Sequence, residues 1–438
     1  MASIVVVGGG IAGLACAWRL RHAEHDVEVL EAADAPGGRV RTTLVDGYRL
    51  ERGPAAFGPL DHNRRVLVHA LGLQDALHPI EPGGSAVLRR GVFVPVPTDS
   101  VRAFFASPLL SVGARVRAAR FALDLVRRRG ELDLHHPERA AARERGDAAT
   151  DLARACGVEA RDFLVAPVLE PRLGAPLEAC SDAFVQLVLL EELRGGGFEA
   201  ITGGMGRVVD ALRDQVAVRC GARVESVETE RGGAVVRYVA SGRERRVFAD
   251  AVVIALPADR AAAVCAKLTP EEHGFLASVG TGRALVVHAL LDEPPRGLAH
   301  YALHVPSQLG LDLARICVEH HKRDAAPPGA GALRIELDPR AVERLWSRDD
   351  DRLGARVLEA LERTPIGRVR PRRIVVERVA SAGSRFAPGA LRRLRAFLER
   401  AERTPRLAFA GDFRVGPYTE GSLTSGLRAA SEVVRALG

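Results

Sequence analysis

The chain has 438 residues, which is long for one domain and suggests two domains, each with its own hydrophobic core. A hydrophobic content of 47% indicates a globular protein and argues against extensive disorder. The formal net charge of +7 is spread over arginines that alternate with acids, without a compact basic cluster interleaved with aromatic residues, so we expect a solvated surface and no nucleic-acid partner.

The six cysteines stand far apart and have no metal-ligand spacing, which is typical of small buried side chains in a reducing compartment. No basic region precedes the first apolar run, so the N-terminus does not read as a signal peptide. No apolar stretch reaches the length needed to span a membrane. We therefore expect a cytoplasmic protein, with peripheral membrane contact left open, and no metal site.

The first 31 residues read as strand, glycine turn, helix, strand and acid. The β-branched run is Ile4 to Val7, the turn Gly8 to Gly13, the helix Leu14 to His22, and the second strand Val27 to Leu30, followed by Glu31. In this order the first glycine permits the tight turn, the second lets the backbone approach a pyrophosphate, and the third lets the helix pack on the sheet. The free N–H groups at the helix start would bind the pyrophosphate, and Glu31 would accept hydrogen bonds from a ribose. The pattern predicts a dinucleotide site, and an acid here favours a free ribose hydroxyl over a phosphorylated one.

A second glycine pair follows in the turn Pro36 to Arg39, where the guanidinium can face phosphate oxygens. Together with the first motif, this pair resembles the flavin-binding signature of the amine oxidase superfamily, which includes monoamine and polyamine oxidases, protoporphyrinogen oxidases and carotenoid desaturases. The segment Glu51 to Phe57 also resembles the Glu-x-Gly-Pro segment that protoporphyrinogen oxidases place near the isoalloxazine ring. The resemblance implies FAD, not NAD.

Residues 86 to 192 have a different sequence pattern from the nucleotide-binding residues that precede them. An extended piece at Val92 to Pro97 precedes a predicted basic, amphipathic helix from Ser100 to Arg129. Such a helix packs its apolar side on the core in most proteins, but it could also lie on an anionic membrane surface. The polar, alanine-rich stretch Glu131 to Thr150 predicts an exposed helix or a mobile loop. Asp162 to Ser181 resembles the helical substrate region of the desaturase and protoporphyrinogen oxidase branch.

The chain then returns to the nucleotide domain. A glycine turn at Thr202 to Gly206 precedes a predicted helix, and strands follow. The resemblance implies that the backbone of Val224 contacts the adenine. The expected elements are a helix at Val208 to Gln215 and strands at 216–218, 223–227, 234–239 and 250–257.

From Gly280 to about Arg403 the pattern again indicates a substrate domain, with strands at 284–291 and 333–337 and a helix at 350–361. His288 lies in the first strand without an acid beside it, so we expect a structural histidine. His320 and His321 would point to opposite faces of a strand, which argues against a metal site.

The C-terminal region carries the second resemblance. A strand from Leu407 ends at Gly411 and Asp412, and Thr419 opens a last helix that runs to Leu437. This resembles the family's second flavin motif, in which the acid holds the ribityl chain or the pyrophosphate region. The helix start near Gly421 would face the N1 and O2 edge of the flavin, where its dipole stabilises the negative charge of the reduced ring.

The sequence thus predicts an α/β protein with a Rossmann-like FAD-binding domain, from residues 1–85, 198–279 and 404–438, and a discontinuous substrate domain of helices and antiparallel sheet, from 86–197 and 280–403. The expected flavin-binding residues are Gly8, Gly10, Ile11, Ala12, Gly13, Glu31, Ala32, Gly37, Gly38, Arg39, Gly53, Pro54, Ala55, Val224, Gly411, Asp412, Gly421, Ser422 and Leu423.

The sequence defines the reaction less closely than it defines the fold and the cofactor. Amine oxidases of this family commonly hold a lysine near the flavin N5, but Val286 stands near the expected place, and neither Lys267 nor Lys322 fits it well. An aromatic pair that would cage an amine is also not evident, because only Phe413 and Tyr418 lie near the last motif. We therefore expect hydride removal from a C–H bond of an apolar, polycyclic or polyene substrate, with no catalytic residue assigned.

Alternatives stay open at this point. A flavin amine oxidase or a protoporphyrinogen oxidase proper would carry the same cofactor motifs, although the stretch 380–389 follows the family pattern only loosely. A lipid or prenyl-partner escort protein of the same fold would bind without redox turnover. The substrate, the electron acceptor, the use of a catalytic base and the oligomeric state are not determined by these residues.

Overall fold

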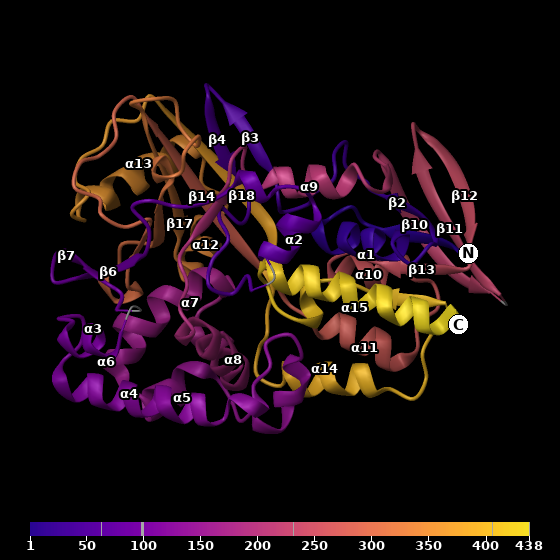
Figure 1. Ribbon diagram of the computed structural model, residues 1–438, viewed down its shortest axis with the longest axis horizontal. Coiled ribbons are helices and arrows are strands. Elements are labelled where there is room, and N and C mark those ends of the chain that lie inside the picture. Colours follow the sequence, from indigo (N-terminus) through magenta and orange to yellow (C-terminus); the bar gives the residue numbers. More distant parts are fainter. Residues whose placement is uncertain (63, 98–99, 231, 405, 438) are drawn as a thin grey trace.

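A computed structural model describes residues 1–62, 64–97, 100–230, 232–404 and 406–437. The two N-terminal strands belong to a parallel, five-stranded sheet in the order β19-β13-β1-β2-β9. Its strands are β1 (Ser3–Val7), β2 (Asp26–Leu30), β9 (Ala217–Arg219), β13 (Ala251–Ile254) and β19 (Leu407–Phe409). Strands that are far apart in the sequence thus lie side by side, as the sequence pattern predicts (Figure 1).

The two faces of this sheet are covered by different elements, since successive side chains of a strand point to opposite faces. Ile4 and Val6 pack into a core with three helices, whereas Val5 and Val7 pack into a core with an antiparallel three-stranded sheet and further helices. The helices of the first face are α1 (Ile11–Arg21), α9 (Gly206–Arg213) and α15 (Thr419–Leu437). The elements of the second face are β10 (Ala222–Glu230), β11 (Gly233–Ala240), β12 (Arg243–Ala249), α10 (Ala258–Val264), α11 (Pro270–Ser278) and α14 (Ala390–Glu399).

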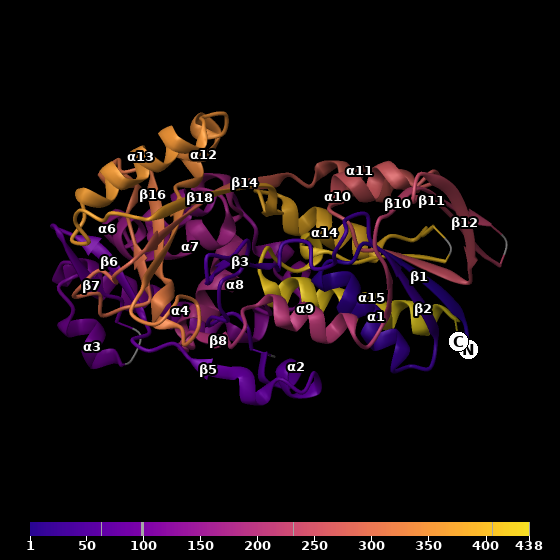
Figure 2. The ribbon, with the colours of Figure 1, turned by 90° about the horizontal axis from the view of Figure 1, so that it is seen from above.

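A seven-stranded, mainly antiparallel sheet has the order β18-β14-β17-β16-β15-β6-β7. Its strands are β6 (Ser85–Arg89), β7 (Val92–Pro95), β14 (Thr281–Leu291), β15 (Ala302–His304), β16 (Leu313–Val318), β17 (Gly331–Leu337) and β18 (Arg373–Ser384). One face packs its leucines, isoleucines and valines against α12 (Pro339–Leu345) and α13 (Asp350–Glu362). Figure 2 shows these two helices along one side of the sheet, with α7 on the other.

The helical part of the chain, between β7 and β8, lies along one edge of the molecule (Figure 1). Its helices are α3 (Val101–Ala106), α4 (Val112–Arg127), α5 (Ala148–Ala155), α6 (Val158–Ala160), α7 (Ala166–Leu173) and α8 (Asp182–Leu193). Smaller elements elsewhere are β3 (Thr42–Val45), β4 (Tyr48–Glu51), α2 (Arg64–Ala70), β5 (Leu77–Pro79) and β8 (Glu199–Ile201).

Two expectations for the helical part are corrected. The predicted helix from Ser100 to Arg129 is divided into α3 and α4, because Pro108 cannot continue a helix and the hydroxyls of Ser100 and Ser111 each cap a new one. The stretch Glu131 to Thr150 is not an exposed helix or a loose loop, since a short 3-10 segment buries Ala140 and Ala141.

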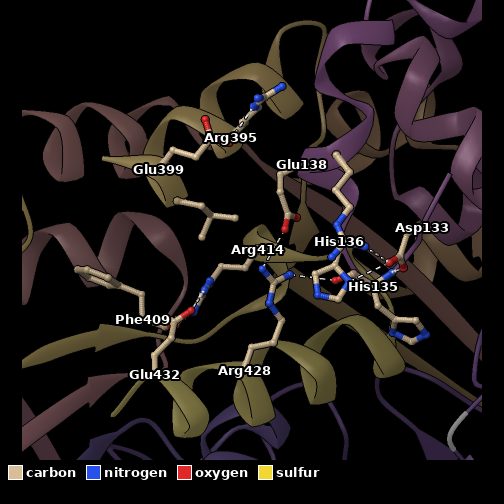
Figure 3. A network of polar contacts seen from close by, with 12 residues as sticks. Asp133, His135, His136, Glu138, Arg395, Glu399, Phe409, Arg414, Arg428 and Glu432 are labelled. Carbon is tan, nitrogen blue, oxygen red and sulfur yellow. Dashed lines mark hydrogen bonds and ion pairs between the residues drawn. The ribbon is translucent and has the colours of Figure 1, made fainter. Parts of the chain in front are cut away.

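Charged side chains connect the stretch Glu131 to Thr150 with the C-terminal helix α15 by hydrogen bonds and an ion pair (Figure 3). Arg428 of α15 donates to the carbonyl of His135 at 2.9 Å and to the carboxylate of Glu138 at 3.1 Å. One turn further along α15, Glu432 accepts from the buried Arg414. The last helix of the chain therefore joins the parallel sheet to the helical part.

Candidate cofactor and substrate site

A cavity of about 630 Å³ extends from the carboxyl end of β1 to the face of the seven-stranded sheet that α12 and α13 leave uncovered. Most of the residues expected to bind flavin line it. They are Gly8, Gly10, Ile11, Ala12, Glu31, Gly37, Gly38, Arg39, Gly53, Pro54, Ala55, Gly411, Asp412 and Ser422. The structure therefore brings together segments from both ends of the chain and from its first quarter.

The glycine turn has room for a phosphate group. Gly10 caps α1 without a side-chain hydrogen bond, and a Cβ atom built on Gly10 would meet nothing within 4 Å, so the backbone there faces open space. At Gly13 the opposite holds, because a Cβ atom would lie 2.0 Å from the carbonyl oxygen of Gly8. The free N–H groups and the positive end of the helix dipole suit an anionic pyrophosphate, so the residues present fit a dinucleotide.

Glu31 stands beside this turn and holds it. Its carboxylate accepts from the backbone N–H of Gly9 at 2.6 Å and from that of Ala33 at 2.8 Å. The side chain is partly exposed and lines the cavity. Such an acid can also accept from a ribose hydroxyl, as the sequence predicts.

Arg39 and Asp412 form an ion pair across the cavity wall. The guanidinium donates to the Asp412 carboxylate at 2.7 Å and to the carbonyl of Ala382 at 2.9 Å. Ser384 donates its hydroxyl to the same carboxylate at 2.7 Å and its backbone N–H at 3.0 Å. Burial alone would raise the pKa of Asp412, but the charge of Arg39 and these hydrogen bonds outweigh burial, so the pKa lies below its usual value. The sequence did not predict this pair, which joins the two flavin-like motifs directly.

Five expected residues lie off the cavity wall. Gly13 packs against β1, Gly421 packs closely on the carbonyl of Gly416, and Leu423 is buried in the core beside α1. Ala32 is exposed next to Glu31. Val224 lies on β10, where the pairing with β11 shifts register between Val224 and Ser226. That irregularity is typical of strands that leave backbone groups free for another partner.

The start of α15 reaches the cavity through Thr419 and Ser422. The backbone N–H of Glu420 donates to the carboxylate of Asp61 at 3.2 Å, and Asp61 also lines the cavity. The positive end of this helix therefore already faces one carboxylate.

The face of the seven-stranded sheet opposite α12 and α13, on which α7 also packs, is the other wall of the cavity. On β17, Leu333, Ile335 and Leu337 belong to the apolar core, of which Leu337 also reaches the cavity, while Arg334 and Glu336 between them line it. On the neighbouring strands, Arg315, Cys317 and Val286 line it as well. The alternation in the sequence of β17 predicts two faces, but only the pairing of strands shows that the polar residues of neighbouring strands meet.

Buried cations from the same region hold the loop that follows β4. Arg334 donates to the carbonyls of Glu51 at 3.3 Å and Gly53 at 2.8 Å. Lys322 donates to the carbonyl of Ala55 at 2.6 Å and to the Glu319 carboxylate at 2.5 Å. The loop expected to lie near the flavin ring is therefore fixed by hydrogen bonds to its backbone. Lys322 itself does not line the cavity, and no lysine does so in the part of the chain that the structure describes.

The histidines considered from the sequence, His288, His320 and His321, do not line the cavity. His288 is buried, and burial together with the charge of Arg334 lowers its pKa to about 3, so the ring is neutral at physiological pH. His320 and His321 lie in a short 3-10 turn with Glu319, not on a strand as expected. Within the described residues, no group of three or more His, Cys, Asp or Glu side chains could hold a metal ion. All six cysteines are free, and only Cys220 is not fully buried.

The fold and this site define a dinucleotide-binding protein with its cofactor cradle beside a large cavity. The family described as flavin containing amine oxidoreductase matches residues 11–434, and the chain belongs to this family. The predicted class, a flavin-dependent oxidoreductase, and the predicted cofactor, FAD, are thereby confirmed.

Among curated relatives, the coproporphyrinogen III oxidase of Mycobacterium bovis is 27% identical over 99% of this chain and 98% of its own length. That of Propionibacterium freudenreichii is 37% identical, but the match covers 28% of this chain and 24% of the relative. A zeta-carotene-forming phytoene desaturase of Myxococcus xanthus is 51% identical over 51 residues, 12% of this chain and 10% of its own. The match to the Propionibacterium protein therefore spans only about a quarter of that relative's length.

Solved structures agree in fold. A putative protoporphyrinogen oxidase from Exiguobacterium superposes with a TM-score of 0.77 at 20% identity, covering 100% of this chain and 98% of the other. Putrescine oxidase bound to putrescine superposes with a TM-score of 0.79 at 22% identity, covering 99% of each chain. These likenesses confirm the Rossmann-like fold with a substrate region, and they extend to the fold alone.

Proposed function

We propose that the protein uses FAD to remove hydride from a C–H bond of a large, mainly apolar substrate, and that this substrate is a porphyrinogen. The observation that carries the proposal is the single cavity that runs from the glycine cradle to the sheet face, with a wall that includes Leu285, Val286, Val342 and Val379. When bound, FAD supplies the hydride acceptor. The chain supplies the shape of the cavity, the position of the C–H bond and the exclusion of water.

The residues that would hold the cofactor are those of the cradle. The backbone at Gly10, Ile11 and Ala12 would bind the pyrophosphate, and Glu31 the adenosine ribose. We further propose that the backbone of Val224 contacts the adenine, and that Ser422 and the loop Gly53 to Ala55 lie beside the ring system. The ion pair of Arg39 and Asp412 would keep the two halves of this cradle together.

An amine is a less suitable substrate than a porphyrinogen. The charged residues of the cavity wall are six arginines against four acids, which disfavours an ammonium group, and the side chain of Val286 is apolar at the place where amine oxidases hold a lysine. The nearly full-length relative named coproporphyrinogen III oxidase also supports a porphyrinogen over a polyene, because the desaturase match covers only 12% of this chain.

Anaerobic bleaching of the bound flavin tests this proposal. The purified protein is reconstituted with FAD, and the loss of its visible absorption is followed after addition of coproporphyrinogen III, protoporphyrinogen, a polyene or an alkyl amine. We expect rapid bleaching by a porphyrinogen. Bleaching by only the amine or the polyene would contradict the porphyrinogen assignment. A flavin that no candidate substrate reduces would instead favour the escort function.

We also propose that α3 and α4 contact an anionic membrane surface. Their solvent-facing side exposes Val101, Phe105, Val112 and Leu123, of which Val101 is 75% and Val112 68% exposed. Between residues 100 and 130, Asp124 is the single acid, and the arginines are Arg102, Arg115, Arg117, Arg120, Arg127, Arg128 and Arg129. Apolar side chains among arginines suit the headgroup region of such a surface. Among the described residues, no helix combines the length and apolar character needed to cross a bilayer.

Cosedimentation with phosphatidylglycerol vesicles tests the membrane contact, with phosphatidylcholine vesicles for comparison. We expect binding to the anionic vesicles that falls in the double variant Val112→Ser/Leu123→Ser. Phe248→Ser is a matched control, because Phe248 is 54% exposed but lies on β12, away from α4 (Figure 1). Equal binding of all three proteins would contradict the proposal.

The domain division predicted from the sequence is kept as a proposal. The strands of the parallel sheet all come from 1–85, 198–279 and 404–438, which supports a cofactor domain built from these segments. The seven-stranded sheet takes nearly all of its residues from 86–197 and 280–403. We propose a cytoplasmic location with the membrane contact above, and the division predicts that the cavity lies where the two domains meet.

A further inference from the structure

A polar cluster interrupts the cavity wall on the face of the seven-stranded sheet opposite α12 and α13. Glu336 of β17 accepts two hydrogen bonds from Arg315 of β16, at 3.0 and 2.7 Å, and a third from Arg334 of its own strand. All three side chains line the cavity. Burial opposes the charge of Glu336, but the two guanidiniums outweigh burial and lower its pKa to about 2, so the carboxylate stays ionised.

Two guanidiniums thus share one carboxylate. The other charges nearby are already paired, since Arg172 of α7 binds Glu192 and Lys322 binds Glu319. The carboxyl group of Glu51 accepts from the backbone N–H of Met205 and from the hydroxyl of Thr42, on the far side of its loop. Buried guanidiniums are normally matched by carboxylates or other acceptors. This sheet face has two guanidiniums and one carboxylate, so it lacks a second carboxylate.

The donor that remains free is on Arg315. Its Nε and Nη2 atoms bind Glu336, whereas Nη1 forms no hydrogen bond with any described residue. Arg334 is held more fully, because each of its three nitrogens already has a partner: Nε and Nη2 bind backbone carbonyls and Nη1 binds Glu336. Arg315 therefore presents an unused donor on the wall of the cavity.

His304 lies directly opposite Arg315 in the pairing of β15 with β16, on the same face of the sheet. Its Nδ1 atom contacts the carbonyl of Pro167 at 2.8 Å, which leaves the fully buried Nε2 without a partner. Burial, and then the charges of Arg315 and Arg172, lower the pKa of this histidine to about 3. A buried nitrogen without a partner, beside an unused guanidinium donor, leaves the polar groups of this part of the sheet face incompletely satisfied.

We infer that Arg315, supported by Arg334 and facing His304, forms a subsite that binds a carboxylate group of the substrate. The inference rests on the proposed function and names one more feature of the substrate: a mainly apolar body that carries an acid. A guanidinium with a free N–H group is well suited to a carboxylate, and a hydrogen bond to a charged group inside a cavity is stronger than one between neutral groups. Arg315 is then a specificity residue, and it is far along the chain from both flavin motifs.

Binding of matched acids and methyl esters tests the subsite separately from turnover. Coproporphyrin III is compared with its tetramethyl ester, and retinoic acid with methyl retinoate, by titration into the FAD-loaded protein with fluorescence detection. We expect the acid of at least one scaffold to bind about ten- to a hundredfold more tightly than its ester, as one charged hydrogen bond would give. The variant Arg315→Met should lower the affinity of that acid to the affinity of the ester and leave ester binding unchanged.

Two further variants distinguish loss of the subsite from misfolding. Arg315→Met/Glu336→Gln removes the pair together and should lose the preference for the acid in the same way. Arg283→Met is the control, because Arg283 also lines the cavity but binds Glu343 and stacks on Trp346, and it should keep the preference. Equal affinities of acid and ester on both scaffolds, lack of any acid binding included, would overturn the subsite. A preference that survives in both Arg315 variants would overturn it too.

The two proposals can fail independently. If the tetramethyl ester of coproporphyrinogen bleaches the flavin as fast as the acid does, the proposed function stands and the subsite falls. If no porphyrinogen bleaches the flavin but retinoic acid binds more tightly than its ester through Arg315, the subsite stands and the porphyrinogen assignment falls.

Discussion

Replacing Gly10 and Gly13 with alanine, one at a time, separates cofactor binding from folding. In Gly13→Ala the new methyl group would lie 2.0 Å from the carbonyl oxygen of Gly8, a backbone atom that cannot turn away. Overpacking of this kind costs about 1 to 3 kcal/mol, which exceeds the gain of about 1 kcal/mol from alanine in a helix. We therefore expect Gly13→Ala to lower the melting temperature of the apoprotein.

Gly10→Ala should behave differently. Gly10 has φ −68° and ψ 170°, which alanine adopts freely, and its Cβ position is open, so the apoprotein should keep its stability or gain about 0.4 to 1 kcal/mol. The methyl group would stand where a pyrophosphate approaches the backbone. Loss of one charged hydrogen bond costs about 1.5 to 3 kcal/mol, which raises the Kd for FAD about ten- to a hundredfold.

The assay combines differential scanning fluorimetry of the apoproteins with FAD titration, in which quenching of flavin fluorescence gives the Kd. The expected result is a stable Gly10→Ala protein that binds FAD weakly. An unchanged Kd for Gly10→Ala would refute the cradle. A Gly13→Ala apoprotein as stable as the wild type would refute the packing argument.

The remaining predictions concern carboxylates and one lysine. Glu31→Ala should raise the Kd for FAD about ten- to a hundredfold in the same titration, because it removes a charged acceptor, and an unchanged Kd would count against the ribose assignment. Burial raises the pKa of Glu51 to about 7, so the folded protein binds the extra proton between its ordinary pKa and pH 7 and loses stability as the pH rises through that window. Glu51→Gln should flatten this dependence in urea unfolding between pH 5 and pH 8, where the wild type should lose about 2.5 kcal/mol, and a wild type with no such slope would contradict the reasoning. Lys322→Met should cost about 3 to 5 kcal/mol of unfolding free energy by leaving Glu319 buried and unpaired, and the double variant with Glu319→Gln should recover most of that loss. No recovery in the double variant would show that the pair itself is not what stabilises the loop.

Local sequence patterns predicted the cofactor half of this protein well, because its elements are specified by neighbouring residues. The strand from Ile4 to Val7, the glycine turn and the acid at Glu31 are contiguous, and each residue type has one physical role there. The start and end of α15 were predicted in the same way from Thr419 and Leu437. The error at Ser100 to Arg129 arose because hydrophobic periodicity outweighed Pro108, although that proline and the two capping serines were visible signals.

The substrate half could not be predicted to the same depth, because its wall is made by strand pairing. Arg315, Arg334 and Glu336 come from two strands, and only their register places the three side chains on one face. The Arg39–Asp412 pair joins residues separated by 373 positions, and neither residue signals its partner locally. Lys322 was set aside because it did not fit a catalytic position, whereas its hydrogen bond to the Ala55 carbonyl depends on packing between distant segments.

The bond between Arg39 and Asp412 also bears on how the protein is made. During synthesis the glycine turn, Glu31 and Arg39 emerge at least 373 residues before the carboxylate of Asp412 that pairs with Arg39, and before helix α15. The cradle can therefore close only after residue 412 has been translated, and contacts of such long sequence separation form slowly. We expect a chain interrupted before residue 412 to bind FAD weakly, because it lacks the carboxylate that pairs with Arg39.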